Sequence, residues 1–371
     1  MRSLLVLLAA LLVLGAAADA PATPLAPVSL AVPPMGVNDW NATGCTDAFD
    51  EAWMHAQADA LVSTGLRDLG YRDVDLDDCW AAPQRVDGRL VADPVRFPHG
   101  IAALADDLHA RGLRLGLYTS AGTMTCDPRG FPASLGHETA DAATFAAWGV
   151  DYVKEDDCST AGTDAIARYT AMATALRATG RPVVFAVCDK GNSAPWRWAP
   201  GIAQVWRTTH DVADDWGSVA DIVRRTTAIP VVRGNDPDML EVGNGGLTPT
   251  EQATQMAVWS MLGAPLLAGT DLAAAARTDP ATIALLGNRV LVAIDQDPAW
   301  STPAVTWDGN RLTLRRGLAD GRTAVSVTAL GDAPEAVPAG VAGRDVVAGG
   351  TVAPRTVVPP HATVVVVGRF R

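Results

Sequence analysis

The feature of this sequence that most constrains its fold is a repeated alternation of short apolar runs with amphipathic stretches. Eight apolar, strand-like runs lie at residues 34–37, 71–76, 113–118, 151–153, 182–187, 204–206, 230–232 and 265–267. Stretches with apolar residues at i, i+3 and i+4, the spacing of one helix face, lie at 49–66, 101–109, 140–148, 165–178, 219–228 and 250–262. About eight such alternations in roughly 260 residues predict an α/β fold, a (β/α)8 TIM barrel.

An open, doubly wound sheet is the competing fold for the same alternation. Such a sheet usually carries a glycine-rich phosphate loop after its first strand. Residues 35–38 read MGVN and do not form such a loop. The barrel is therefore the preferred prediction.

The pattern changes near Asp297, where the helical stretches end. Beyond this point apolar and polar residues alternate, with frequent Gly and Pro, and strands are predicted at 311–315, 323–327 and 362–367. We expect a catalytic barrel over residues 27–298, followed by an antiparallel β-sandwich domain over 303–371.

The first residues have the pattern of a secretory signal peptide. Arg2 supplies a positive charge, residues 4–14 are apolar, and small residues follow from Gly15 to Ala20. The apolar run is shorter than the ~18–20 residues that a membrane span requires. We expect residues 1–20 to be a signal peptide and the protein to be secreted, with no membrane association after its removal. The five cysteines are then free to form disulfides, with one left over.

Charge and histidine spacing argue against two classes of function. The net charge of −12 would repel a phosphate backbone, so nucleic acid is not an expected partner. The six histidines have no metal-ligand spacing, which argues against a catalytic zinc site. We expect no metal and no cofactor.

Acidic residues follow six of the eight predicted strands, namely the second and the fourth to eighth. In a barrel, the carboxyl ends of the strands form one rim, where active sites lie. Carboxylates gathered there repel one another unless Lys or Arg side chains, a metal or a cationic transition state compensates. Glycoside hydrolysis suits such a site, because it uses two carboxyl groups and passes through a positive, oxocarbenium-like transition state. Trp40, after the first strand, could provide an aromatic surface for a sugar.

Several longer motifs carry a resemblance to a known family. They are residues 33–41 (PPMGVNDWN), 76–80 (LDDCW), 93–101 (DPVRFPHGI), 148–154 (WGVDYVK), 206–211 (WRTTHD), 235–240 (NDPDML) and 243–246 (GNGG). In sequence and order they resemble the α-galactosidase (melibiase) family, glycoside hydrolase family 27. The resemblance extends from about Pro33 to Pro298.

This resemblance implies a retaining exo-glycosidase that releases terminal α-D-galactosyl residues from an oligosaccharide or polysaccharide by double displacement. Asp156 would be the nucleophile and Asp211 the general acid/base. The implied sugar-binding residues are Trp40, Asp77, Asp78, Tyr118, Cys126, Lys154, Asp189, Arg207, Asp238 and Met239. The implied disulfides are Cys45–Cys79 and Cys126–Cys158, which leave Cys188 free. The oligomeric state stays open, with a homodimer among the alternatives.

One departure from the family keeps other functions open. The fifth strand usually ends Cys-Glu-Trp-Gly in this family, whereas residues 188–191 read CDKG. In this family that segment contacts the sugar near its 2-position, so an α-N-acetylgalactosaminidase, whose sugar differs from galactose there, is one alternative. A β-L-arabinopyranosidase, whose sugar is galactose without the 6-hydroxymethyl group, is another alternative on the same machinery. A catalytically inactive, secreted carbohydrate-binding protein and a metal-dependent barrel enzyme are the alternatives from other classes.

Overall fold

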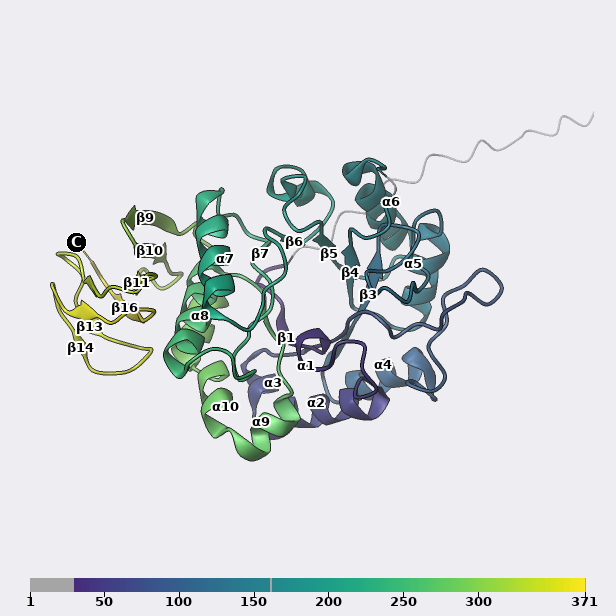
Figure 1. Cartoon of the computed structure of the whole chain (residues 1–371), viewed down its shortest axis with the longest axis horizontal. Helices are drawn as coiled ribbons and strands as arrows, with labels where there is room; N and C mark the ends of the chain where they lie inside the picture. The colour runs from purple at the N-terminus through teal and green to yellow at the C-terminus, as the bar shows by residue number, and fades with distance from the viewer. Residues whose placement is uncertain (1–29, 161, 371) are drawn as a thin grey trace, which may run out of the picture.

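The computed structural model describes residues 30–160 and 162–370, so the predicted signal peptide lies outside the described residues. Eight parallel strands form one curled sheet, and helices surround it (Figure 1). The strands are β1 (Met35–Asn38), β2 (Asp73–Leu76), β3 (Arg114–Ser120), β4 (Tyr152–Asp156), β5 (Val184–Cys188), β6 (Val205–Arg207), β7 (Asn235–Asp236) and β8 (Leu266–Ala268). The predicted TIM barrel is confirmed.

The sheet closes into a barrel next to β7. Strand order runs β7-β6-β5-β4-β3-β2-β1-β8, with β1 paired to both β2 and β8. Leu240 closes the remaining gap, because its amide donates to the carbonyl of Leu267 and its own carbonyl accepts from the amide of Gly269. All carboxyl ends of the strands therefore meet at one mouth.

The outer helices begin at sequence-encoded caps. Asp50, Asp164, Asp215 and Thr248 each accept a hydrogen bond from a first-turn amide. Thr248 and Glu251 form a complete capping box. The helices after these caps are α2 (Glu51–Ser63), α6 (Ala165–Ala178), α7 (Trp216–Ala228) and α8 (Pro249–Leu262). The remaining helices are α1 (Trp40–Thr43), α3 (Leu66–Leu69), α4 (Gly100–Ala110), α5 (Glu138–Ala147), α9 (Leu272–Thr278), α10 (Pro280–Leu286) and α11 (Arg289–Asp295).

Two local features differ from regular alternation. Residues 189–204, all of them described by the structure, contain only two 3-10 turns, Pro195–Arg197 and Ala199–Gly201, in place of an α-helix between β5 and β6. The prediction of the seventh strand at 230–232 is wrong, because β7 starts at Asn235. Pro230 has no amide hydrogen to donate to a sheet. Pairing with β6 starts only where the amide of Trp206 donates to the carbonyl of Gly234.

The C-terminal part is antiparallel, as the alternation of its residues predicts. β9 (Ala304–Asp308), β10 (Arg311–Gly317), β11 (Thr323–Ala329) and β16 (Thr363–Gly368) form one four-stranded sheet. Two small hairpin-like pairs accompany it: β12 (Glu335–Ala336) with β15 (Val357–Val358), and β13 (Gly343–Arg344) with β14 (Thr351–Val352). A valine-rich core lies between these sheets.

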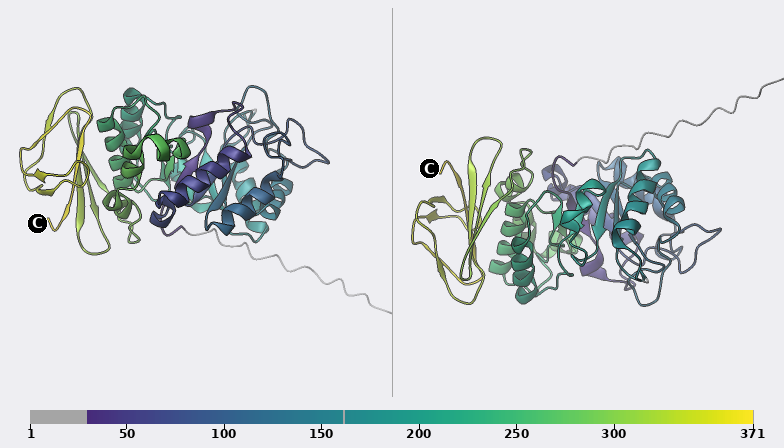
Figure 2. Two further views of the ribbon diagram at one scale, coloured as in Figure 1. Left: turned by 90° about the horizontal axis from the view of Figure 1, so that it is seen from below. Right: turned by 90° about the horizontal axis from the view of Figure 1, so that it is seen from above.

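The C-terminal sheets lie to one side of the barrel, against the outer helices α7 and α8 (Figure 2). Arg316 on β10 is fully buried and donates to the carbonyl of Ser260 on α8 at 3.1 Å. Its guanidinium also stacks over the Trp300 ring. Such contacts pack these sheets against the outside of the barrel. Within residues 30–160 and 162–370, no helix is both long and apolar enough to cross a membrane.

Candidate active site

A small cavity of about 80 Å³ opens where the strands end. All of the sugar-binding residues implied by the sequence, except Asp189, line it together with both implied catalytic carboxylates. The lining residues are Trp40, Asn41, Asp77, Asp78, Tyr118, Cys126, Lys154, Asp156, Lys190, Arg207, Asp211, Val212, Asp238 and Met239. The barrel therefore collects, from the strands β1 to β7 and the loops after them, side chains that are far apart in the sequence.

Asp156 is the last residue of β4. Side-chain alternation along the strand turns Tyr152, Lys154 and Asp156 toward the barrel interior. One carboxylate oxygen of Asp156 accepts from the Tyr118 hydroxyl at 3.2 Å, and the other accepts from the amide of Asp157 at 2.7 Å. These bonds fix the direction of a buried carboxylate at the cavity floor.

Glu155, between Lys154 and Asp156, faces the other way, as the alternation predicts. Its side chain is buried near Glu138 and Asp141 of α5 and near Arg168 of α6. Burial first, and then the charge of Glu138, raises the pKa of Glu155 well above its usual value. It takes no part in the cavity.

Asp211 lies in the loop after β6 and faces Asp156 across the mouth. Its side chain is 62% exposed, and Oδ1 accepts from Arg207 at 3.1 Å. Partial burial opposes ionisation of Asp211, but the charges of Arg207, Lys190 and Lys154 outweigh it and hold its pKa below the ordinary value. An exposed carboxyl at the rim can exchange protons with solvent and with a departing group.

Asp77, after β2, is fixed by ionic and backbone contacts. Lys154 donates to Asp77 at 2.7 Å, and the side-chain amide of Asn38 donates to the same oxygen at 2.9 Å. The amide of Asp77 in turn donates to Asp39 at 2.7 Å. Lys154 is half-buried, and although burial disfavours its charge, Asp77 raises its pKa well above the usual value. A charged lysine and its carboxylate partner thus both face the cavity.

Asp78, the next residue, accepts hydrogen bonds from the amides of Cys79 and Asp127. Burial raises the pKa of Asp78 to about 6. The neighbouring Cys79 has a φ of 74°, in the left-handed region that favours glycine. A disulfide and these carboxylate bonds hold that turn in place.

Arg207 and Asp238 form the opposite wall. The Arg207 guanidinium, 4% exposed, lies 2.9 Å from Asp238, which also accepts from the amide of Val212 at 2.8 Å. Beneath them lies the unpaired thiol of Cys188, 3.7 Å from Arg207. Burial raises the pKa of Cys188 well above its usual value, so the thiol is neutral. Arg207 thus links the loop that carries Asp211 to the seventh-strand loop.

The structure corrects the prediction for Asp189, which does not line the cavity. Its side chain is 0% exposed and accepts from the amides of Gly191 at 3.0 Å and Ser193 at 2.9 Å, and from the Ser193 hydroxyl. This is the bonding of an Asx turn, for which an Asp followed by Gly and Ser is a recognisable signal. Lys190 takes the position at the cavity instead, and the sequence reasoning missed it.

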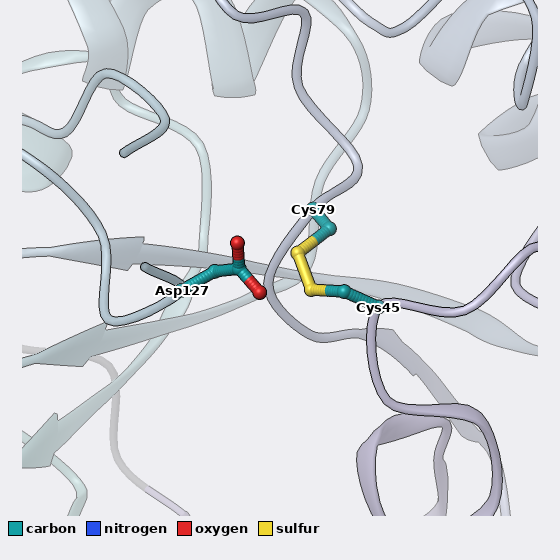
Figure 3. A group of neighbouring side chains, drawn as sticks. All are labelled: Cys45, Cys79 and Asp127. Atoms are coloured by element: carbon teal, nitrogen blue, oxygen red, sulfur yellow. A yellow bond between two sulfur atoms is a disulfide. The ribbon is translucent and has the colours of Figure 1, made fainter. Parts of the chain in front are cut away.

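Two disulfides tie the loops of the mouth together, as the resemblance implied. Cys45–Cys79 joins the loop after β1 to the loop after β2, and Asp127 lies beside it (Figure 3). Cys126–Cys158 joins the loops after β3 and β4, next to Asp156. The sulfurs of these pairs are oxidised, so they offer a metal no thiolate ligand. They hold the loop that carries Asp78 and the loops next to Asp156 at the end of β4.

The separation of the carboxyl groups of Asp156 and Asp211 can be bounded. Lys190 Nζ lies 3.4 Å from Asp156 Oδ1 and 3.4 Å from Asp211 Oδ2. Twice that distance is the furthest apart these two oxygens can lie, so they are within about 7 Å of each other. This limit includes the ~5–5.5 Å between the two carboxyl groups of retaining glycosidases, and it excludes most of the ~6.5–9.5 Å range of inverting glycosidases. A barrel with this pair of carboxylates around a cavity at the carboxyl ends of its strands belongs to the class of glycoside hydrolases.

Comparison with known proteins identifies the family within this class. The melibiase family profile described as alpha galactosidase A matches residues 32–297. An α-galactosidase of Cyamopsis tetragonoloba is 46% identical over 270 residues, covering 71% of this chain and 64% of that protein. The chain therefore belongs to the melibiase family, glycoside hydrolase family 27, and the match spans less than two thirds of the length of this relative.

Solved structures agree with this assignment. The crystal structure of α-galactosidase I from Mortierella vinacea superimposes with a TM-score of 0.84 at 33% identity, covering 91% of this chain and 97% of that one. An α-galactosidase from Saccharomyces cerevisiae, solved with raffinose, gives a TM-score of 0.80 at 26% identity, covering 92% of this chain and 98% of that one. Both likenesses extend over the barrel and the C-terminal sheets.

Proposed function

We propose that this protein is a retaining exo-α-galactosidase. Asp156 attacks the anomeric carbon and forms a covalent glycosyl-enzyme, while Asp211 protonates the departing oxygen. Asp211 then removes a proton from the water that releases the sugar. The observation that carries this proposal is the facing pair of carboxylates, one buried and fixed and the other exposed at the rim.

The enclosed part of the cavity suits one sugar unit. We assign Asp77 and Asp78 to its 4- and 6-hydroxyls, and Lys154 and Arg207 to further hydroxyls. Trp40 would cover its apolar face, with Tyr118, Cys126, Asp238 and Met239 completing the pocket. The raffinose complex of the yeast relative supports a galactoside as substrate.

The signal pattern at residues 1–20 and the two disulfides support secretion of the mature enzyme. A catalytic unit over 27–298 and a separate β-sandwich unit over 303–371 remain our proposed domain division. It rests on the change from barrel helices to antiparallel strands, of which β9 is the first.

A larger cleft beside the cavity offers room for the leaving group. It has a volume of about 580 Å³ and shares Trp40, Asn41 and Val212 with the cavity. Its other walls carry polar groups, among them Asn244 and Glu241, and burial raises the pKa of Glu241 to about 7. We assign this cleft to the neutral saccharide that follows the scissile bond.

Ala274→Trp should test that assignment. Ala274 lies on α9 in the wall of the cleft, so a bulky side chain there would occupy the space of the leaving saccharide. We expect kcat/KM for raffinose to fall about tenfold or more, as for the loss of a contact worth roughly 1.4 kcal/mol. The value for nitrophenyl α-D-galactopyranoside should stay within about twofold. Ala276→Trp, exposed on the same helix, is the matched control; equal losses on both substrates would contradict the assignment.

The proposed activity itself is tested by a panel of nitrophenyl glycosides. We expect release from the α-D-galactopyranoside, and much slower release from the β-L-arabinopyranoside and the α-N-acetylgalactosaminide. A preference for either of the last two would keep the mechanism but change the sugar. Binding of galactose without any hydrolysis would instead favour an inactive carbohydrate-binding protein, and loss of activity with a chelator a metal-dependent one.

A further inference from the structure

Lys190 lines the candidate site between Asp156 and Asp211. Its Nζ lies 3.4 Å from Asp156 and 3.4 Å from Asp211, and its side chain is 26% exposed. One cation thus bridges the two carboxylates on which the proposed chemistry depends.

The backbone around Lys190 fixes where its side chain can go. Lys190 has a φ of 57° and Gly191 a φ of 80°, both in the left-handed region. A Cβ at Gly191 would lie 2.4 Å from the carbonyl oxygen of Thr208, so this turn packs directly against the loop that leads to Asp211. Asp189 anchors the turn from the other side through its bonds to Gly191 and Ser193. The backbone of this turn is therefore fixed, and it directs the Lys190 side chain toward the cavity.

Lys190 has more acidic than basic neighbours. Asp156 from β4, Asp211 from the loop after β6, and the neutral thiol of Cys188 face Lys190, and Arg207 is the opposing cation. The cations around Asp211 are Arg207, Lys190 and Lys154. The other groups near it are Asp156 at the end of β4, Cys188 at the end of β5 and Asp238 in the loop after β7. In the part of the chain that the structure describes, Lys190 is the only one of these three cations that forms ion pairs with both Asp156 and Asp211.

We propose that Lys190 is a positioning residue that holds Asp156 and Asp211 in register and sets the upper pH limit of the reaction. This inference rests on the proposed roles of the two carboxylates. The bridging cation offsets their mutual repulsion when both are ionised, and it keeps each carboxylate directed at the space between them.

The direction of the pH effect follows from the chemistry of the two steps. The first step needs Asp211 protonated. A nearby cation lowers the pKa of Asp211, so its carboxyl group loses the proton, and the first step slows, at a lower pH. Removing the cation should raise that pKa and move the basic limb of kcat/KM to higher pH. The second step needs Asp211 ionised, so the same change should slow hydrolysis of the glycosyl-enzyme near the acid end.

The test compares Lys190→Met with Lys190→Arg and the wild type on raffinose, whose sugar leaving group needs protonation. For Lys190→Met we expect the basic limb of kcat/KM to move to higher pH by about one unit. This is the low end of the pKa shift that a nearby charge causes, because Asp211 is largely exposed. Lys190→Arg keeps the charge and should restore the wild-type limb. Asn192→Ala, an exposed neighbour in the same turn, should leave it unchanged. An unmoved limb in Lys190→Met, with the rate lowered equally at every pH, would overturn the proposal.

A second measurement does not depend on turnover. Carbon-13 NMR of the carboxyl groups, with Asp211→Asn used to assign the signal, gives the titration midpoint of Asp211 directly. We expect that midpoint to rise in Lys190→Met and to stay in place in Lys190→Arg. An unchanged midpoint would overturn the role of Lys190 even if the enzyme is active, whereas a shifted midpoint without raffinose hydrolysis would uphold the role and count against the proposed function.

Discussion

Asp156→Asn is expected to lower kcat on nitrophenyl α-D-galactopyranoside by at least about 10⁴-fold, because a neutral amide cannot form the covalent glycosyl-enzyme. The fold should survive, since the amide oxygen of Asn can still accept from Tyr118 or from the amide of residue 157. Stopped activity assays and urea unfolding of the same preparation measure the two effects separately.

Asp157→Asn is the matched control for this change. Asp157 is the next residue, but its carboxylate pairs with Arg168 outside the cavity. It should keep activity within about tenfold of the wild type, the scale of an indirect effect rather than of a lost nucleophile. Comparable losses in both variants would indicate damage to the strand end, and would remove Asp156 from the role of nucleophile.

Asp211→Asn should separate substrates according to their leaving groups. We expect a loss of about 10² to 10⁴-fold in kcat/KM on raffinose, the usual range for a missing general acid. On a dinitrophenyl α-galactoside, whose leaving group departs without protonation, the loss in the first step should be much smaller. The variant should also lose the basic limb of the pH profile, because the group that titrates there is gone.

The arrangement of the site gives this second prediction its control. Asp238 also contacts Arg207, but it is buried and accepts a hydrogen bond from the backbone amide of Val212. Asp238→Asn should therefore affect both kinds of substrate alike. If Asp211→Asn also lowered both rates equally, the acid/base assignment would be wrong and Asp211 would have only a binding role.

Much of this architecture follows from local sequence patterns. The carboxyl-end position of Asp77, Asp156 and Asp211 depends only on where apolar runs stop, and a barrel brings such ends together. The inward direction of Lys154 and Asp156, with Glu155 outward, follows from the two-residue period of a strand. The alternation of apolar and polar residues in β10 likewise predicts a strand with one buried face.

What the sequence reasoning missed depends on tertiary packing. Which of Asp189 and Lys190 reaches the cavity is decided by two consecutive left-handed residues and by the contact of Gly191 with the Thr208 carbonyl. The start of β7 depends on Gly234, where a Cβ would meet the Trp206 ring at 2.5 Å. Neither contact has a signature in the neighbouring residues alone, because the partner lies on another strand.

The most direct test of the account is to trap the covalent intermediate. The enzyme would be treated with a slowly hydrolysed, fluorinated α-galactosyl fluoride, digested and sequenced by mass spectrometry. We predict one galactosyl adduct on the peptide that carries Asp156, and its absence in Asp156→Asn. An adduct on a different residue, or no adduct together with release of galactose of inverted configuration, would contradict the proposed double displacement.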